Sequence, residues 1–282
     1  MTLGVDSVGG VAVLTGAWQA GDRDTLARSP VRRLVVNGAP DIEFLAAIPP
    51  LDELELHHLP LKDIRPLEAQ PQLRALSLNA YYTSAFDFRQ LARLERLHLD
   101  WGPGAESIAG LAHLQDLSVS RYPGTDLALL SPLAGLHSLR IAEARRAASL
   151  RGIASFPSLQ RLRLLALPAL RDLAPIGELG LSLRSLELSR CRRVGRLDEL
   201  HRLINLERLL VLDCGAIDSL HPIQDLPLRE LHFYESTNIV DGDLSALLAM
   251  ATLRDVSFAN RRHYSETRES LVQALTTRSV PG

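Results

Sequence analysis

Leucine and other large aliphatic residues recur along this chain in the pattern L-x-x-L-x-L, and successive copies begin 20 to 25 residues apart. Eleven copies begin at Val31, Leu51, Leu73, Leu94, Leu114, Leu136, Leu159, Leu183, Leu206, Leu228 and Leu253, and a degenerate copy begins at Val8. The last two apolar positions of each copy alternate with polar ones. This alternation predicts a short β-strand in every repeat.

The other half of most repeats carries an apolar residue at every third position, as in Ile42, Leu45 and Ile48. A period of three favours short 3₁₀ turns, in which side chains three residues apart lie one above another. Many of these segments contain a proline, which argues against long α-helices there. These prolines are Pro66, Pro132, Pro157, Pro175 and Pro222. The segment from Val194 to Leu203 has no proline and is expected to be a truer helix.

The repeat resembles that of the leucine-rich-repeat family over residues 31–258, and its length is similar to the short repeats of internalins and of a eukaryotic phosphatase regulatory subunit. The resemblance implies an α/β fold: a right-handed solenoid with a parallel sheet on its concave face and 3₁₀ turns on its convex face. The family usually has asparagine, or sometimes cysteine, three residues after the third leucine. Here that column has no asparagine, which puts the regularity of the loops after the strands in doubt. The column reads Leu59, Tyr81, Gly102, Tyr122, Ala144, Leu167, Cys191, Cys214 and Ser236.

An open solenoid exposes its apolar core at both ends and needs a cap at each. We expect residues 1–30 to form an N-terminal cap, with a strand at Val8–Leu14 and a short helix near Asp22–Ala27. We expect the repeats to occupy residues 31–258. Residues 259–282 then form a C-terminal cap helix and tail, with Ser265 as the residue that caps the helix start; a frayed tail is the alternative.

Composition narrows the function. The chain has 282 residues, 46% apolar and only 5% aromatic, with 31 basic and 33 acidic residues. The near-neutral charge argues against a dedicated nucleic-acid binder. No apolar run is long enough for a membrane span, and the first residues do not resemble a secretory signal. Two cysteines form no disulfide framework, so a cytoplasmic location is expected.

Candidate chemistry is sparse. The sequence has no phosphate-binding glycine loop and no Cys-x-x-Cys or Gly-x-Ser-x-Gly motif, so we expect no enzyme activity, metal or cofactor. Cys191 and Cys214 share one repeat position and are expected to be buried, reduced thiols; a catalytic thiol is the alternative. His57, His58, His98 and Asp100 lie two repeats apart, and solvated side chains are favoured there over a metal site. Asp241-Gly242-Asp243 is expected to be a turn.

The third, fifth and seventh positions of each motif point away from the core, onto the open face of the sheet. Basic, large apolar and aromatic residues gather there, a composition typical of protein-binding hot spots. The candidate residues on this face are Arg140, Arg161, Arg163, Leu165, Leu210, Leu212, His232 and Tyr234, and the candidates on the loops after the strands are Trp101, Tyr82 and Tyr122, beside Tyr81. Scattered exposed residues without a function are the alternative.

These observations favour a non-catalytic protein-binding module that holds one folded partner on the concave face, with the arginines meeting acidic groups. Its alanine- and arginine-rich composition suggests a bacterial source. An inhibitor, an immunity-type protein and an adaptor are specific versions. The alternatives are a regulatory subunit of an enzyme and a self-associating structural protein, so a homo-oligomer stays open.

Overall fold

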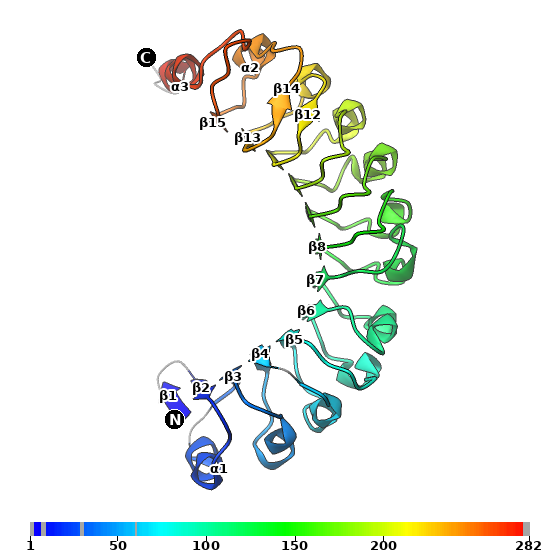
Figure 1. Ribbon diagram of the computed structural model, residues 1–282, viewed down its shortest axis with the longest axis vertical. Helices are drawn as coiled ribbons and strands as arrows, with labels where there is room; N and C mark the ends of the chain where they lie inside the picture. Colours follow the sequence, from blue (N-terminus) through cyan, green and yellow to red (C-terminus); the bar gives the residue numbers. More distant parts are fainter. Residues whose placement is uncertain (1–2, 7–9, 29–30, 60, 279–282) are drawn as a thin grey trace. The chain divides into compact units, whose positions relative to one another are not determined.

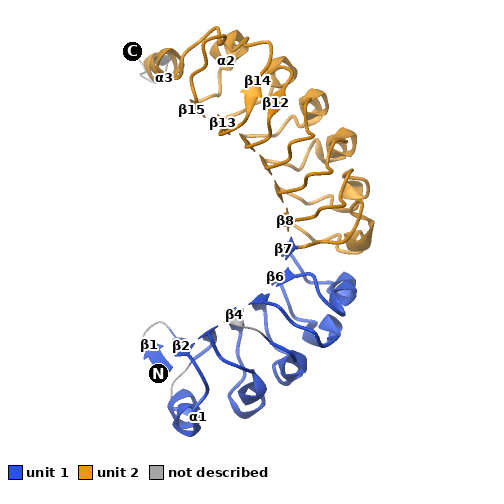
Figure 2. Cartoon of the chain, in the orientation of Figure 1, with its two compact units in different colours: residues 1–120 blue, residues 121–282 orange. Residues whose placement is uncertain are grey.

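The computed structural model describes residues 3–6, 10–28, 31–59 and 61–278 (Figure 1). The chain divides into two compact units, residues 1–120 and residues 121–282, which Figure 2 colours separately. In each unit the strands lie side by side and the short helical segments cover the opposite side of each coil (Figure 1). None of the helices in the described ranges is long and apolar enough to cross a membrane.

The first unit contains one sheet whose strands follow the order of the chain. Its strands are β1 (Leu3–Asp6), β2 (Val11–Thr15), β3 (Arg33–Asn37), β4 (Glu53–Leu59), β5 (Ala75–Ala80), β6 (Arg96–Asp100) and β7 (Asp116–Ser120). All neighbours are parallel except β1, which is antiparallel to β2. The sequence did not indicate β1. The strand expected at Val8–Leu14 is β2, and residues 8 and 9 of that prediction lie outside the described residues.

The second unit repeats the same parallel pairing. Its main strands are β8 (Ser138–Ala142), β9 (Arg161–Leu165), β10 (Ser185–Ser189), β11 (Arg208–Leu212), β13 (Glu230–Tyr234) and β15 (Asp255–Phe258). A second, two-stranded parallel sheet joins β12 (Ala216–Ile217) to β14 (Asn238–Ile239).

The prediction of 3₁₀ turns is confirmed. They are η1 (Glu43–Ala47), η2 (Arg65–Ala69), η3 (Phe88–Leu91), η4 (Ala105–Gly110), η5 (Ala128–Leu130), η6 (Ile153–Ser155), η7 (Ala174–Leu179), η8 (Asp198–Arg202) and η9 (His221–Ile223). The truer helix expected between Val194 and Leu203 is wrong, because η8 is also a 3₁₀ turn. The absence of proline there removes an obstacle to an α-helix, but the apolar period of three still selects the 3₁₀ geometry.

The reason for that period is visible in the backbone. Along these turns the N–H of one buried apolar residue donates a hydrogen bond to the carbonyl of the apolar residue three positions earlier. In η8 the N–H of Leu200 donates to Leu197 at 3.0 Å, and the N–H of Leu203 donates to Leu200 at 2.9 Å. All three side chains are at most 1% exposed. The strand leucines are equally buried, as Leu186 and Leu188 are, so one wedge-shaped side chain fills the same place in each coil.

Three α-helices occur in the described residues: α1 (Ala20–Ala27), α2 (Ser245–Ala249) and α3 (Arg268–Arg278). Helix α3 lies against β15 and buries Leu271 and Leu275. Ser265 does not cap it. The residue before the helix is Thr267, whose hydroxyl accepts a hydrogen bond from the N–H of Ser270 at 3.1 Å, while Ser265 accepts one from the N–H of Leu244.

The loops that follow β7, β8, β9, β10, β11 and β13 are regular. The residue that leaves the strand has a left-handed backbone with φ between 51° and 60°, and none of these is glycine: Arg121, Glu143, Ala166, Arg190, Asp213 and Glu235. The N–H of Ala166 donates to the carbonyl of Ser189 at 2.8 Å, and that of Arg190 to Leu212 at 2.8 Å. The same bond in successive coils keeps these loops in register.

Candidate binding face

The three predicted arginines lie together on the strand face of the second unit, meaning the side of β8–β15 that carries the third, fifth and seventh motif positions. Arg140 on β8 is in register with Arg163 on β9, which is in register with Glu187 on β10. Arg161 and Arg163 are exposed and Arg140 is half-buried. Arg163 Nε also lies 3.2 Å from a carboxylate oxygen of Glu187, so this pair joins β9 to β10.

The apolar candidates lie on the neighbouring strands. Leu212 on β11 is in register with Tyr234 on β13, and both are half-buried. Leu165 on β9 is half-buried too and is separated from Leu212 by Ser189 on β10. Partly exposed leucine and tyrosine beside arginine provide area that a partner can bury.

Leu210 does not belong to this exposed set. It is in register between Glu187 and His232, and its exposed fraction is 9%. The side chains of the two adjacent strands cover it, so the prediction that Leu210 is available to a partner is wrong. Neighbours on a parallel sheet are about 4.8 Å apart, which is close enough for long polar side chains to shield a leucine between them.

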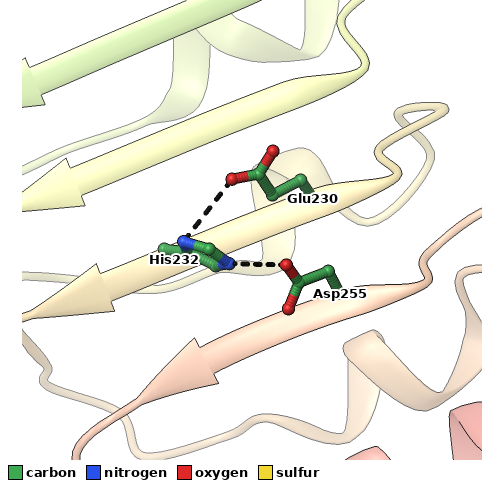
Figure 3. Close-up of side chains that lie close together, drawn as sticks. All are labelled: Glu230, His232 and Asp255. Atoms are coloured by element: carbon green, nitrogen blue, oxygen red, sulfur yellow. Dashed lines mark ion pairs between the residues drawn. The ribbon is translucent and has the colours of Figure 1, made fainter.

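Glu230, His232 and Asp255 form a polar network at the end of the same face (Figure 3). His232 Nδ1 faces Glu230 at 3.5 Å, and His232 Nε2 faces Asp255 at 3.2 Å. Glu230 also pairs with Arg208, whose Nε lies 2.9 Å from its other oxygen. This network is the one grouping of potential metal ligands among the described residues.

The geometry fits ion pairs better than a metal site. One ligand atom from each of the three residues lies within 4.8 Å of the other two, but the two carboxylates face different ring nitrogens of His232. Arg208 competes for Glu230 as well. His232 was predicted from the sequence, but its cluster with Glu230 and Asp255 was not. The available signal was the spacing Glu230-x-His232 with Asp255 at the equivalent position of the next repeat.

The predicted group of histidines is held differently. His57 Nε2 lies 3.0 Å from Glu55, and Asn79 lies 3.4 Å from His57 Nδ1. Burial pushes the pKa of Glu55 up, but hydrogen bonds from His57 and Arg33 outweigh it and hold that pKa below its usual range. The strand-face acids of the first unit are thus largely neutralised, since Arg33 and Arg96 also pair with Glu53. The side chain of His58 lies outside the described residues.

Two aromatic candidates are buried. Tyr82 is 3% exposed and Tyr122 is 2% exposed, so the prediction that they present their rings to a partner is wrong. A Cβ added to Gly102 would lie 2.6 Å from the ring of Tyr82, and one added to Gly124 would lie 2.5 Å from the ring of Tyr122. The bare glycines leave room for the rings to fold inward.

Of the other loop aromatics, Trp101 is half-buried and Tyr81 is 66% exposed. The loop cluster therefore keeps one fully exposed ring, which lies in the first unit.

Several solved structures have a fold similar to that of this chain. The internalin InlF of Listeria monocytogenes matches with a TM-score of 0.63 and 17% identity over 90% of this chain and 83% of that one. The fold is the leucine-rich-repeat solenoid. A leucine-rich-repeat protein of Leptospira interrogans matches with a TM-score of 0.58 and 20% identity, covering 88% of this chain and 72% of that one. No protein-family model and no curated protein sequence matches the chain.

In three successive coils of the second unit, a thiol or hydroxyl at or next to the asparagine position of the repeat contacts a backbone carbonyl of the preceding coil. Cys191 Sγ lies 3.4 Å from the carbonyl of Leu164, and Cys214 Sγ lies 3.4 Å from that of Leu188. In the next coil the hydroxyl of Thr237 donates to the carbonyl of Val211 at 2.9 Å. The functional domain of the internalin InlJ from Listeria monocytogenes is also described as including a cysteine ladder; it matches with a TM-score of 0.59 and 14% identity over 92% of this chain and 64% of that one.

Both cysteines of the leucine-rich repeats are buried and neither forms a disulfide. The adjacent Cys191 thiol and burial raise the pKa of Cys214, which keeps that thiol protonated at neutral pH. A protonated, inaccessible thiol is a poor nucleophile. The two residues therefore act as backbone-bonding ladder residues.

The structure also has an open groove of about 450 Å³ between β15 and α3, where the solenoid ends. Its lining is Val256, Ser257, Arg268, Glu269, Val272 and Gln273. It shares no residue with the histidine group of the first unit or with the arginines of the strand face.

Proposed function

We propose that this leucine-rich-repeat protein is a non-catalytic module that binds one folded protein on the strand face of residues 121–282. The supporting observation is the exposed pair Arg161 and Arg163 on β9, with half-buried Leu165 on the same strand and Leu212 two strands away. Arginines give orientation through fork-shaped hydrogen bonds to carboxylates, and apolar groups give buried area. His232 and Tyr234 extend the surface to β13.

The repeat fold and the arginine, leucine and tyrosine composition of this face support binding without catalysis. Such a module acts by covering a partner or by tethering it. Inhibition, immunity to a toxin or adaptor function therefore follow as specific versions of the proposal. A reducing, cytoplasmic location in a bacterium belongs to the same proposal and is supported by the two thiols without a disulfide.

The test is affinity capture from a lysate of the source organism, with identification of bound proteins by mass spectrometry. We expect the double variant Arg161→Glu and Leu212→Asp to lose the partner that the wild type captures, while its thermal unfolding stays close to that of the wild type. A matched control, Arg262→Glu with Ile204→Asp, makes the same changes at exposed residues away from the face and keeps the partner. Capture that survives the double variant would remove the strand face from the proposal.

A further inference from the structure

Charge is distributed unevenly along the chain. Residues 138–196, from β8 to the loop after β10, contain twelve arginines and four acidic residues, a formal net charge of +8. The rest of the chain contains 19 basic and 29 acidic residues, a net charge of −10. The near-neutral total therefore conceals one strongly basic segment inside the second unit.

The basic segment leaves several arginines without a carboxylate. In the first unit Arg32, Arg74 and Arg89 each pair with an acidic side chain. In the basic segment the exposed side chains of Arg145, Arg146 and Arg193 lie beyond 4.0 Å of every carboxylate that the structure describes. Acidic side chains thus neutralise several arginines of the first unit, whereas none in the described ranges does so at these three positions of the basic segment.

Arg145, Arg146 and Arg193 lie on loops at the border of the strand face. Arg145 and Arg146 follow β8 and Arg193 follows β10, so both loops leave the sheet at the same end of the strands. Strands β8 and β10 flank β9, which places the two loops about 10 Å apart. Together with the strand-face arginines they form what we call the arginine band: Arg140, Arg161, Arg163, Arg145, Arg146 and Arg193.

The band lacks the features of a nucleic-acid site. Single-stranded nucleic acids bind on exposed aromatic rings, but residues 138–196 contain one aromatic side chain of Phe, Trp or Tyr, Phe156, and it is fully buried. Leu165 lies among the arginines instead, and Leu212 and Tyr234 continue the surface. The segment has no lysine, and guanidinium groups bind carboxylates through two parallel hydrogen bonds.

We propose that the arginine band receives a strongly acidic surface of the partner protein, with carboxylates on both the strand face and the loops after β8 and β10. This inference rests on the proposed function and specifies the partner's chemistry. Opposite charges of this kind speed association and fix orientation, and their effect decreases as salt screens them.

The test uses a fluorescein-labelled polyglutamate of 20 residues and, separately, a 20-base-pair DNA duplex, with fluorescence anisotropy at 50 and 300 mM NaCl. The wild type is expected to bind polyglutamate, and more weakly at the higher salt. The triple variant Arg145→Glu, Arg146→Glu and Arg193→Glu is expected to bind it about tenfold or more weakly. The matched control, Arg23→Glu, Arg93→Glu and Arg262→Glu, changes the total charge equally at exposed residues outside the band and should bind within about twofold of the wild type.

Two results would overturn the inference. Equal losses in the triple variant and its control would show that total charge alone drives binding, and duplex binding tenfold tighter than polyglutamate binding would assign the band to nucleic acid. Neither result touches the proposed function, which fails separately if partner capture survives Arg161→Glu with Leu212→Asp.

Discussion

The hydroxyl of Thr237 accepts a hydrogen bond from the backbone N–H of Cys214 at 3.0 Å, and it donates one to the carbonyl of Val211 at 2.9 Å. Thr237 is 2% exposed, so water does not replace these bonds. One small side chain thus satisfies a buried donor and a buried acceptor of the preceding coil. The residue continues the ladder that Cys191 and Cys214 begin.

Replacing Thr237 by valine keeps the shape and removes both hydrogen bonds. We expect Thr237→Val to lower the free energy of unfolding by about 1–3 kcal/mol, because the N–H of Cys214 and the carbonyl of Val211 stay buried without a partner. Guanidinium unfolding followed by circular dichroism measures the change. Thr252→Val is the control: its hydroxyl also bonds a carbonyl, that of Leu228, but it belongs to an exposed residue, so a loss below about 0.5 kcal/mol is expected. Equal losses at the two sites would contradict a special role for the ladder.

The ladder also makes stability depend on alkaline pH. Cys191 and burial raise the pKa of Cys214 in the folded protein, whereas an unfolded cysteine has a pKa of about 8.5. The folded state therefore holds this proton more tightly, and the resulting stabilisation is complete below pH ~8.5 and decreases as pH rises above it. We expect the free energy of unfolding to decrease between pH 7.5 and 9.5, measured by guanidinium unfolding in the presence of a reductant. Cys214→Ala should remove this component, so an unchanged pH dependence in that variant would refute the assignment.

Much of the fold could be predicted from the sequence because the repeats pose one packing problem many times. A leucine at a given motif position enters the same environment in every coil, so Leu54, Leu186 and Leu209 share one explanation. The period of three selected the 3₁₀ turns for a similarly local reason. The prediction for Val194–Leu203 went wrong where it depended on a missing proline instead of on that period.

The candidate site was less predictable because exposure depends on neighbours in space. Leu210 and Leu212 occupy equivalent outward positions, yet Leu210 is covered by residues that belong to β10 and β13. Tyr82 is buried because a glycine 20 residues later leaves room for its ring. Six residues with left-handed backbone carry no sequence signal either, since none is glycine or asparagine.

Ala166 illustrates the cost of that left-handed backbone. Its φ is 57°, where a Cβ approaches the following carbonyl oxygen, and glycine relieves this clash. We expect Ala166→Gly to raise the free energy of unfolding by about 1 kcal/mol, measured by guanidinium unfolding. Ala142→Gly is the control, because Ala142 lies in the extended backbone of β8, where alanine has no steric clash for glycine to relieve. This substitution should lower the free energy of unfolding, since glycine weakens a strand. Destabilisation by both substitutions would mean that the methyl group of Ala166 contributes more than its backbone geometry costs.

Substitutions at Leu210 and Leu212 distinguish a residue that stabilises the fold from one that is available to a partner on the strand face. Leu210→Asp places a carboxylate in a covered position beside Glu187, so both desolvation and repulsion oppose folding. We expect it to lose at least about 2 kcal/mol of stability. Leu212→Asp adds the same charge at a half-buried position beside Ser189 and Tyr234 and should lose less than about 1 kcal/mol. Thermal unfolding of the two variants measures the difference, and equal destabilisation would show that Leu212 is a core residue that a partner cannot reach.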